Sequence, residues 1–348
     1  METAGGPLPI VAIGASAGGL EALERFLRHV PERCGLAFIV VQHLDPTHTG
    51  MLPELLQRAT PMPVRQVTDA MAVEPDTVYV IPPNADMALH DGALHLYQPS
   101  APRGLRLPID FLFSSVADHA RERGVGVILS GMGSDGTLGA AAIRANAGVV
   151  MVQDPATAQF DAMPRSAIDA GVADVIAPVA ELPLRIVAYL AHAPLLRPPT
   201  DDDGDASAGV VERIVLMLLE HTGHDFSLYK RATVLRRIER RMGVHQLPGM
   251  DAYVRFLRSN PEELTLLFKE LLIGVTGFFR DAEAWTELGE RVLPPLLARL
   301  DPAQPIRAWV AGCATGEEAY SLAIVLREAV DRLHESRAHP IKVFATDL

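Results

Sequence analysis

Residues 10–23, IVAIGASAGGLEAL, decide the fold of the first half of the chain. A short apolar run, Ile10 to Ile13, breaks into a glycine-rich turn, and apolar residues then recur at helical spacing. The pattern predicts a strand, a tight turn and a helix, with Ser16 on the turn. Glycine lets the backbone bend sharply there, and the N-terminus of the helix directs free N–H groups toward the serine. This geometry suits a nucleophile.

Two other interpretations of the same turn stay open. The spacing of Gly14, Ser16 and Gly19 also imitates a dinucleotide-binding fingerprint whose second glycine is replaced, and a glycine turn can simply close a βα unit. A dinucleotide site needs an acid at the end of the second strand to bind ribose. The sequence has Gln42 and His43 there, which weakens that alternative.

Length and composition limit the class of protein. A chain of 348 residues, 49% hydrophobic and 21% charged, predicts a globular protein of two or three domains. No leader-like segment or run of eighteen apolar residues is present, so we expect a cytoplasmic protein without membrane insertion. The net charge of −12 argues against nucleic acid as a partner. Cys34 and Cys313 lack metal-ligand spacing, so no disulfide and no metal site is expected.

Strand-like runs alternate with helical patterns from residue 10 to about residue 190. The predicted strands are 10–13, 37–42, 77–81, 125–130, 149–153 and 172–176, and the predicted helices are 20–29, 50–59, 111–123, 138–146 and 164–170. Apolar strands separated by helices indicate a parallel sheet covered on both faces, an α/β doubly wound fold. Functional residues of such sheets lie beyond the carboxyl ends of the strands.

Three strand ends carry polar residues that form a set. Ser16 follows the first strand, His43 follows the second, and Asp135 follows the strand that begins near Val125. A serine hydrolase needs an imidazole to accept the hydroxyl proton and a carboxylate to orient that imidazole. These residues are therefore candidates for nucleophile, base and acid. The other candidates that the sequence offers are Asp45, His48, His90 and His95.

Six short motifs in this region agree in order with one family. They are residues 14–19 (GASAGG), 42–43 (QH), 79–83 (YVIPP), 131–136 (GMGSDG), 153–154 (QD) and 163–165 (MPR). Over residues 8–192 the chain resembles the protein-glutamate methylesterases of bacterial chemotaxis. The resemblance implies a catalytic domain at 1–195 that needs no cofactor, with Ser16, His43 and Asp135 as the triad and backbone donors at Ala17 and Met132 for the oxyanion. It also implies glutamate methyl esters on the cytoplasmic helices of methyl-accepting chemoreceptors as substrates, with glutamine amides as secondary ones.

The composition changes after residue 195. Proline, aspartate and small residues at 196–209 predict a solvated linker, and apolar residues at helical spacing then predict an all-α module at 210–285. A basic strip at 228–242 includes Arg236, Arg237, Arg240 and Arg241, which we expect to face outward. Charge of one sign on a helix face favours docking to an acidic surface.

A second strand, glycine turn and helix fall within residues 286–348. The turn lies at residues 312–316, and a further strand ends at Asp347, which is the position of the ribose-binding acid in nucleoside-binding α/β units. Glu317 and Glu318 at the start of the helix would repel phosphate. A cofactor with a positive sulfonium fits this turn better.

Residues 210–348 resemble the chemotaxis receptor methyltransferases. The matching stretches are 229–238, 275–281, 311–321 and 345–347. The resemblance implies S-adenosylmethionine as cofactor, a pocket lined by Thr276, Arg280, Gly312, Glu318 and Asp347, and a basic helix that approaches the receptor. We expect this Rossmann-like domain to be truncated after two strands, so that it binds cofactor weakly and methylates receptors only as part of a longer chain.

The sequence therefore predicts a methylesterase domain fused to the front part of the opposing methyltransferase. Two functions of other classes remain open. One is a dinucleotide-binding oxidoreductase built on the first glycine turn. The other is a non-catalytic signalling scaffold in which both parts only bind receptors.

Overall fold

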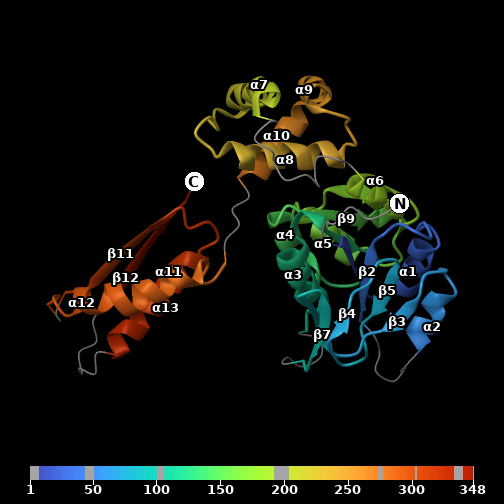
Figure 1. The fold of residues 1–348 in the computed structure, drawn as a ribbon, viewed down its shortest axis with the longest axis horizontal. Helices are drawn as coiled ribbons and strands as arrows, with labels where there is room; N and C mark the ends of the chain where they lie inside the picture. Colours follow the sequence, from blue (N-terminus) through green and yellow to red (C-terminus); the bar gives the residue numbers. More distant parts are fainter. Residues whose placement is uncertain are drawn as a thin grey trace. The chain divides into compact units, whose positions relative to one another are not determined.

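The computed structural model describes residues 8–43, 51–99, 106–191, 204–272, 277–301, 304–332 and 340–347. The chain divides into two compact units, residues 1–273 and residues 274–348. The first unit contains a parallel sheet with its helices and a bundle of further helices (Figure 1). No helix among the described residues is both long and apolar enough to cross a membrane.

A seven-stranded sheet forms the centre of the first unit, with the strand order β10-β9-β8-β1-β2-β5-β3. Its strands are β1 (Ile10–Ala15), β2 (Ala37–Gln42), β3 (Val64–Gln66), β5 (Thr77–Val80), β8 (Gly124–Ile128), β9 (Val149–Gln153) and β10 (Val175–Ala177). Every pairing in this sheet is parallel. The predicted doubly wound parallel sheet is confirmed.

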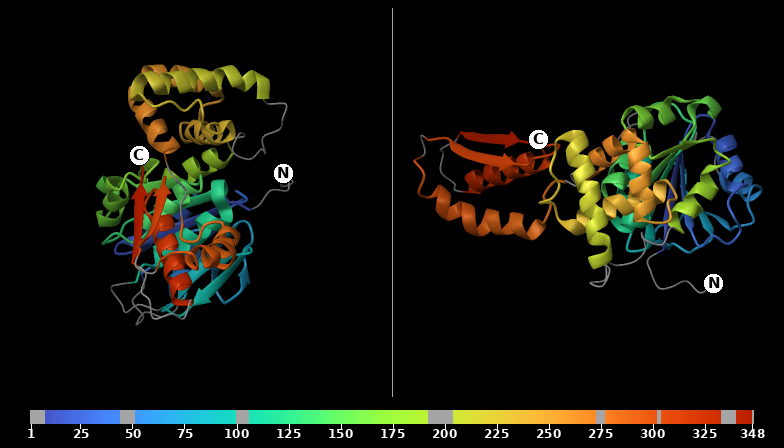
Figure 2. Two further views of the ribbon diagram at one scale, coloured as in Figure 1. Left: turned by 90° about the vertical axis from the view of Figure 1, so that its left-hand side faces the viewer. Right: turned by 90° about the horizontal axis from the view of Figure 1, so that it is seen from above.

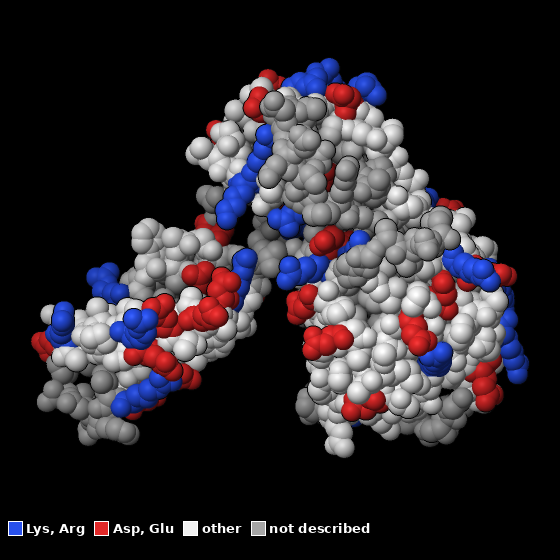
Figure 3. All heavy atoms as spheres, in the orientation of Figure 1, with Lys and Arg blue, Asp and Glu red and all other residues white. Residues whose placement is uncertain are grey.

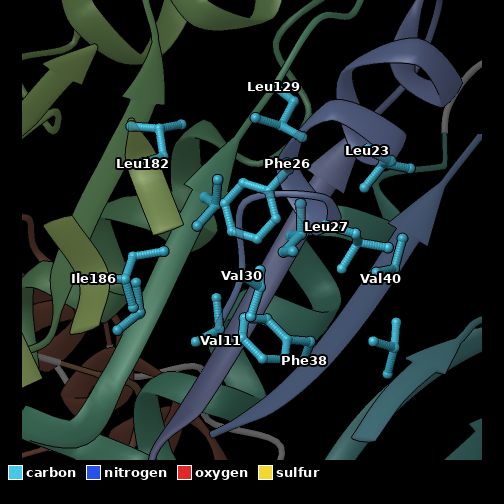
Figure 4. Packing of buried hydrophobic residues seen from close by; sticks show 14 of the residues in the cluster. Val11, Leu23, Phe26, Leu27, Val30, Phe38, Val40, Leu129, Leu182 and Ile186 are labelled. Atoms are coloured by element: carbon cyan, nitrogen blue, oxygen red, sulfur yellow. The ribbon is translucent and has the colours of Figure 1, made fainter. Parts of the chain in front are cut away.

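Both faces of the sheet are covered, because successive side chains of a strand point to opposite faces. Val11 and Ile13 of β1 pack on one face with α1 (Gly19–Leu27), α2 (Met51–Gln57) and α6 (Leu182–Leu190). Figure 4 shows this core, where Phe26 of α1 meets Phe38 of β2 edge to face with ring centres 6.3 Å apart. Ile10 and Ala12 pack on the other face with α3 (Pro108–Ala120), α4 (Thr137–Ala145) and α5 (Ala162–Asp169).

An antiparallel sheet of three short strands interrupts the alternation. It consists of β4 (Met71–Ala72), β6 (Asp86–His90) and β7 (Ala93–Tyr97), and the sequence analysis did not predict it. Single turns of 3₁₀ helix lie at Arg121–Arg123 and Pro155–Thr157. The predicted strand at 172–176 is shifted, since β10 begins at Val175.

Four helices follow the sheet and belong to the same compact unit. They are α7 (Gly204–Thr222), α8 (Arg231–Val244), α9 (Met250–Ser259) and α10 (Pro261–Leu271), and both views of Figure 2 show them as one bundle. Ile214, Leu218, Ile238 and Leu267 are among the residues of their shared apolar core. We call these four helices the helical module. The predicted linker at 196–209 is too long, because α7 already begins at Gly204.

A buried carboxylate joins three helices of the helical module. Glu263 at the start of α10 accepts hydrogen bonds from Arg241 Nε at 2.8 Å and from the Tyr253 hydroxyl at 2.8 Å, and it lies 2.9 Å from His245 Nε2. Burial alone would raise the pKa of Glu263, but hydrogen bonds from His245 and Arg241 outweigh it and lower the pKa from 4.5 to about 2.

The second unit is a smaller α/β structure. It contains α11 (Ala282–Glu287), a π-helical turn (Leu288–Val292), α12 (Leu293–Leu297), β11 (Ile306–Ala311), α13 (Glu317–Arg332) and β12 (Ile341–Thr346). β11 and β12 pair in parallel, and α13 packs on one face of the pair. The predicted boundary at residue 285 lies too late, because the second unit already begins at residue 274.

We predict that acid destabilises the helical module through Glu263. The folded state lowers the pKa of this carboxyl from 4.5 to about 2, so its contribution to stability is complete above pH 4.5 and is lost as the pH falls toward 2. The loss is at most about 3 kcal/mol. Hydrogen exchange of α8–α10, measured between pH 5 and pH 3, should show this decrease in the wild type and a smaller one in Glu263→Gln. Glu262→Gln, at the exposed neighbouring position, should behave like the wild type; an identical pH response in Glu263→Gln would contradict the prediction.

Candidate active site

Three strands bring the predicted triad residues to one edge of the sheet. Ser16 directly follows β1, His43 directly follows β2, and Asp135 lies in the loop between β8 and α4. β1 pairs with both β2 and β8. The strands that follow β2 lie on one side of β1 and the strands from β8 onward lie on the other, so the strand order reverses at β1. Ligand sites of open α/β sheets lie beyond the carboxyl ends of the strands at such a point.

The turn after β1 fixes the position of Ser16. Its N–H donates to Ser130 O at 3.0 Å, and its carbonyl accepts from Gly19 N at 2.9 Å, where α1 begins. Gly18 has a φ of +69°, and a Cβ there would lie 2.6 Å from Gln159 Oε1 and 2.8 Å from Ser130 Oγ. The position therefore requires glycine. Ser16 is held partly exposed beside the loop that follows β8.

His43 and Asp135 are hydrogen-bonded to each other. His43 Nε2 lies 2.8 Å from Asp135 Oδ2, with side chains 35% and 4% exposed respectively. The backbone N–H of His43 donates to Ala15 O at 3.2 Å, which places the histidine next to the residue that precedes Ser16. An ionised carboxylate accepts hydrogen bonds only, so Asp135 selects the tautomer protonated at Nε2 and leaves Nδ1 unprotonated. Nδ1 is therefore the ring nitrogen that can act as a base.

The N-terminus of α3 holds the Asp135 carboxylate in place. The N–H groups of Ile109 and Asp110 donate to Asp135 Oδ2 and Oδ1 at 3.1 and 2.9 Å. The first N–H groups of a helix have no partner within the helix, and the helix dipole favours a negative charge there. These two hydrogen bonds thus fix the carboxylate in the position from which it contacts His43. The sequence analysis missed this contribution of Ile109 and Asp110, although Pro108 at the first helical position was a signal for it.

Two further carboxyl groups lie near Asp135 but differ from it in environment. Burial raises the pKa of Asp110, and the charge of Asp135 adds to the rise despite a hydrogen bond from Gly139 N at 2.7 Å. Burial also raises the pKa of Asp86. These two carboxyl groups therefore differ from Asp135 in their contacts, since only Asp135 accepts hydrogen bonds from the first N–H groups of α3.

Two backbone N–H groups are available to stabilise an oxyanion. Among the described residues, none accepts a hydrogen bond from the N–H of Ala17 or of Met132. Ala17 follows the nucleophile candidate, and Met132 follows Gly131, where a Cβ would lie 2.1 Å from Met163 Sδ and 3.0 Å from Ser16 Cβ. Glycine at 131 thus lets the two segments approach closely. Paired N–H donors beside a nucleophile are typical of an oxyanion hole.

Buried polar side chains hold the two donor segments together. Gln153 accepts from Ser130 N at 2.9 Å, and the Ser130 hydroxyl donates to Ala17 O at 2.9 Å and accepts from Phe160 N at 3.0 Å. Both side chains are almost completely buried. The sequence analysis quoted Gln153 as a motif residue and assigned it no role.

The other candidates of the sequence analysis lie elsewhere or outside the described residues. His90 and His95 belong to β6 and β7, where their rings face each other at 6.2 Å, and His95 Nδ1 lies 3.8 Å from Asp69. No hydrogen bond or ion pair among the described residues joins them to Ser16. Asp45 and His48 lie outside the described residues.

The predicted orientation of the basic strip is wrong. Arg237, Arg240 and Arg241 are 8%, 0% and 3% exposed, and only Arg236 of the four predicted docking residues faces solvent. The physical reason is that carboxylates distant in sequence pair with these arginines, which the charge pattern of α8 alone does not reveal. Arg237, Arg240 and Arg241 are therefore not available as a free docking surface.

Part of the predicted cofactor site in the second unit comes together around a glycine turn. Gly312 follows β11 with a φ of +76°, and Asp347 follows β12 and accepts a hydrogen bond from Ala314 N at 2.6 Å. Glu318 is exposed in the first turn of α13, and Phe279 N donates to Ser321 Oγ at 3.0 Å, which ties the segment containing Arg280 to the same helix. Thr276 lies outside the described residues.

This arrangement fits S-adenosylmethionine in its chemistry. No atom lies within 4 Å of the Cβ that Gly312 lacks, so a ligand can approach the backbone there. The carboxylates of Glu318 and Asp347 suit a ligand with hydroxyl groups and positive charge, and they do not suit a phosphate.

Comparison with protein families identifies the first domain. The family model for CheB methylesterase matches residues 11–186, which include Ser16, His43 and Asp135. The chain belongs to the CheB methylesterase family. After this domain, the all-alpha domain of CheR methyltransferase matches residues 211–272, and the SAM binding domain of CheR methyltransferase matches residues 274–348.

The chain is also similar to individual curated proteins and to a solved structure. A Rhodobacter capsulatus protein described as an uncharacterised 104.1 kDa protein is 42% identical over 85% of this chain and 33% of its own length. A protein-glutamate methylesterase/protein-glutamine glutaminase of Moorella thermoacetica is 35% identical over 53% of this chain and 45% of its own. The chain thus spans a third to about half of the length of these relatives. The crystal structure of the Thermotoga maritima CheB methylesterase catalytic domain is 29% identical with a TM-score of 0.49, covering 52% of this chain and 98% of that one.

We predict that a fluorophosphonate probe labels Ser16 and no other serine. Asp135→Asn should slow this labelling by about 1,000-fold, because an amide cannot select the tautomer of His43 that the carboxylate selects. Asp110→Asn is the matched control at a neighbouring carboxyl. Its rate should stay within about threefold of the wild type, because the amide oxygen still accepts the Gly139 N–H. Peptide mapping by mass spectrometry checks the site, and equal rates in the two variants would contradict the assignment.

Proposed function

We propose that the CheB domain of this chain hydrolyses glutamate methyl esters on the cytoplasmic helices of methyl-accepting chemoreceptors, with glutamine amides as secondary substrates. The observation that supports this most directly is the His43–Asp135 hydrogen bond at the edge of the sheet that also carries Ser16. The N–H groups of Ala17 and Met132, which have no acceptor among the described residues, belong to the turns after β1 and β8 at this edge. An ester or amide carbonyl needs a nucleophile, a base and an oxyanion site, and these residues supply all three.

The proposed reaction begins with attack of Ser16 Oγ on the ester carbonyl carbon while His43 takes the hydroxyl proton. The N–H groups of Ala17 and Met132 stabilise the negative oxygen of the tetrahedral intermediate. The C–O bond to the methoxy group then breaks, and His43 returns the proton so that methanol leaves. Water, deprotonated by His43, hydrolyses the acyl-enzyme and releases glutamate and free Ser16. Asp135 orients His43 throughout and stabilises its protonated form.

The remaining alternatives are less well supported by the site. An oxidoreductase would need an acid at the end of β2 to bind ribose, and there His43 is held by Asp135 instead. A non-catalytic scaffold does not require a buried carboxylate that three donors hold in place. We place the reaction in the cytoplasm, where the methylated helices of chemoreceptors lie.

We further propose that the turn at Gly312 binds S-adenosylmethionine, which supplies the methyl group for the opposing reaction on receptor glutamates. Asp347 accepts a hydrogen bond from Ala314 N, which holds its carboxylate at the end of β12, the position from which such an acid binds ribose hydroxyls. Glu318 follows the glycine turn in the first turn of α13. We propose that its carboxylate supplies negative charge that favours the positive sulfonium of the cofactor. Arg280 and Thr276 complete the proposed contacts.

We predict that Ser16→Ala loses about 10⁴-fold or more of methanol release from a methylated receptor fragment, and that His43→Gln loses a similar amount, because triad members act as a unit. Ser134→Ala, at an exposed serine of the loop after β8, is the control and should keep wild-type turnover. Gas chromatography of released methanol measures the rate. Normal turnover by Ser16→Ala would refute the proposed nucleophile, and absence of release by the wild type would favour the scaffold.

We predict weak binding of S-adenosylmethionine, weakened further by at least about tenfold in Asp347→Ala, because one hydrogen bond to a charged group is lost. Isothermal titration calorimetry measures both affinities. Asp331→Ala, at an exposed acid of α13, should bind like the wild type. Equal affinity of the wild type and Asp347→Ala would exclude Asp347 from the site.

A further inference from the structure

Arginines of helix α8 contact the CheB domain, and two of them donate hydrogen bonds to its backbone. Arg237 donates from Nη1 and Nη2 to Arg144 O and Ala145 O at 3.2 and 3.0 Å, and Arg240 donates from Nε to Gly148 O at 2.8 Å. Arg144 O and Ala145 O are the last carbonyl groups of α4, which have no partner within their own helix. Arg237 therefore caps α4, where the helix dipole favours a positive charge. We call Arg237 and Arg240 the arginine face of α8.

Two buried carboxylates pair with the arginine face. Asp174, which precedes β10 in the CheB domain, is hydrogen-bonded to Arg240, and Glu270 of α10 lies 2.9 Å from Arg240 Nη1 and 3.2 Å from Arg237 Nη1. Arg144 of the CheB domain reaches both carboxylates, at 3.4 Å to Asp174 and 3.1 Å to Glu270. The side chains of Asp174, Arg240 and Glu270 are completely buried.

Three arginines, Arg144, Arg237 and Arg240, share two buried carboxylates in this contact, so each carboxylate has more than one positive partner. Burial alone would lower the pKa of Arg240, but Asp174 and Glu270 outweigh it and raise the pKa above its usual value, so Arg240 stays charged. Moving the two domains apart exposes these groups to water, while any other close arrangement leaves buried charges unpaired. Figure 1 shows α8 above the part of the sheet that contains β9. Figure 3 shows positive and negative side chains next to one another below the helical module.

The contact lies at the edge of the sheet opposite the triad. Gly148 directly precedes β9 and Asp174 directly precedes β10, so the arginine face meets the amino ends of these strands. Ser16, His43 and Asp135 follow the carboxyl ends of their strands. Occupation of the arginine face therefore leaves the esterase site open.

We propose that the arginine face of α8 is a docking surface for the CheB domain of the same chain, and that this contact closes it to any acidic partner. The helical module and the CheB domain thus act as one unit, joined through Asp174, Arg240 and Glu270. This inference does not depend on the proposed esterase activity, since it concerns the opposite edge of the sheet.

The test is modification of the whole protein with phenylglyoxal, an arginine reagent, followed by peptide mass spectrometry. Arg237 and Arg240 should react at least about tenfold more slowly than Arg236, because reaction requires the interface to open. Arg236 is exposed on the same helix and serves as the internal reference. Arg241 should also be slow, because Glu263 holds it within the helical module.

Two substitutions from opposite sides of the interface separate docking from folding. Asp174→Ala in the CheB domain and Arg240→Ala in α8 should each raise the reactivity of Arg237 toward that of Arg236. Arg241 should stay slow in both variants, because its hydrogen bonds to Glu263 at 2.8 and 2.6 Å remain when Asp174, its more distant partner at 3.9 Å, is replaced. A slow Arg241 then shows that the helical module remains folded. Asp169→Ala, at an exposed acid of α5, is the matched control and should leave Arg237 protected.

Each outcome decides the matter. The proposal is supported if Arg237 and Arg240 react slowly with phenylglyoxal in the wild type. Both substitutions must also speed the reaction of Arg237 while Arg241 stays protected. Reaction of Arg237 and Arg240 as fast as Arg236 in the wild type would show that the contact does not exist in solution. Continued protection of Arg237 in both variants would show that the helical module shields it without the CheB domain, which would contradict the proposal. If one variant also exposes Arg241, Arg144→Ala replaces it, and the result is again decided by whether Arg237 reacts while Arg241 stays protected.

Discussion

The carboxylate of Asp135 is the group on which the arrangement of the site depends. It accepts hydrogen bonds from His43 and from the first N–H groups of α3, and so joins the end of β2, the loop after β8 and a helix that covers the sheet. The donors come from two distant parts of the chain, the end of β2 and the start of α3, and the parallel sheet with aligned carboxyl ends brings β2 and the loop after β8 together. The fixed carboxylate determines the tautomer of His43, and through His43 the position of a base beside Ser16.

The two edges of the sheet use opposite ends of helices for opposite charges. At the carboxyl edge the N-terminus of α3 holds a carboxylate, and at the amino edge the C-terminus of α4 accepts hydrogen bonds from Arg237. Helix dipoles favour both arrangements. One covering layer of helices thus contacts the proposed esterase site at one edge of the sheet and the helical module at the other.

The sequence predicted the central strands because each is a buried apolar run followed by a glycine turn or a polar residue, and Ser16, His43 and Asp135 stood directly at those ends. It did not predict β6 and β7, whose mixed side chains lack the apolar run of a buried strand. It also predicted the wrong orientation for Arg237, Arg240 and Arg241. Helical periodicity assumes that charged residues face water, and it cannot detect a carboxylate such as Asp174 that is distant in sequence but adjacent in space. The contribution of Ile109 and Asp110 was missed for a related reason, since Pro108 marks the start of a helix but does not reveal which distant carboxylate its N–H groups hold.

The central claim is that the ends of β1, β2 and β8 form a working catalytic site, and a crystal structure of the protein with a phosphonate bound covalently to Ser16 tests it most directly. The tetrahedral phosphorus imitates the intermediate of ester hydrolysis, so its oxygen should lie about 3 Å from the N–H groups of both Ala17 and Met132. The hydrogen bond between His43 and Asp135 should remain. A phosphonate oxygen that points to solvent, with neither N–H within hydrogen-bond distance, would contradict the account.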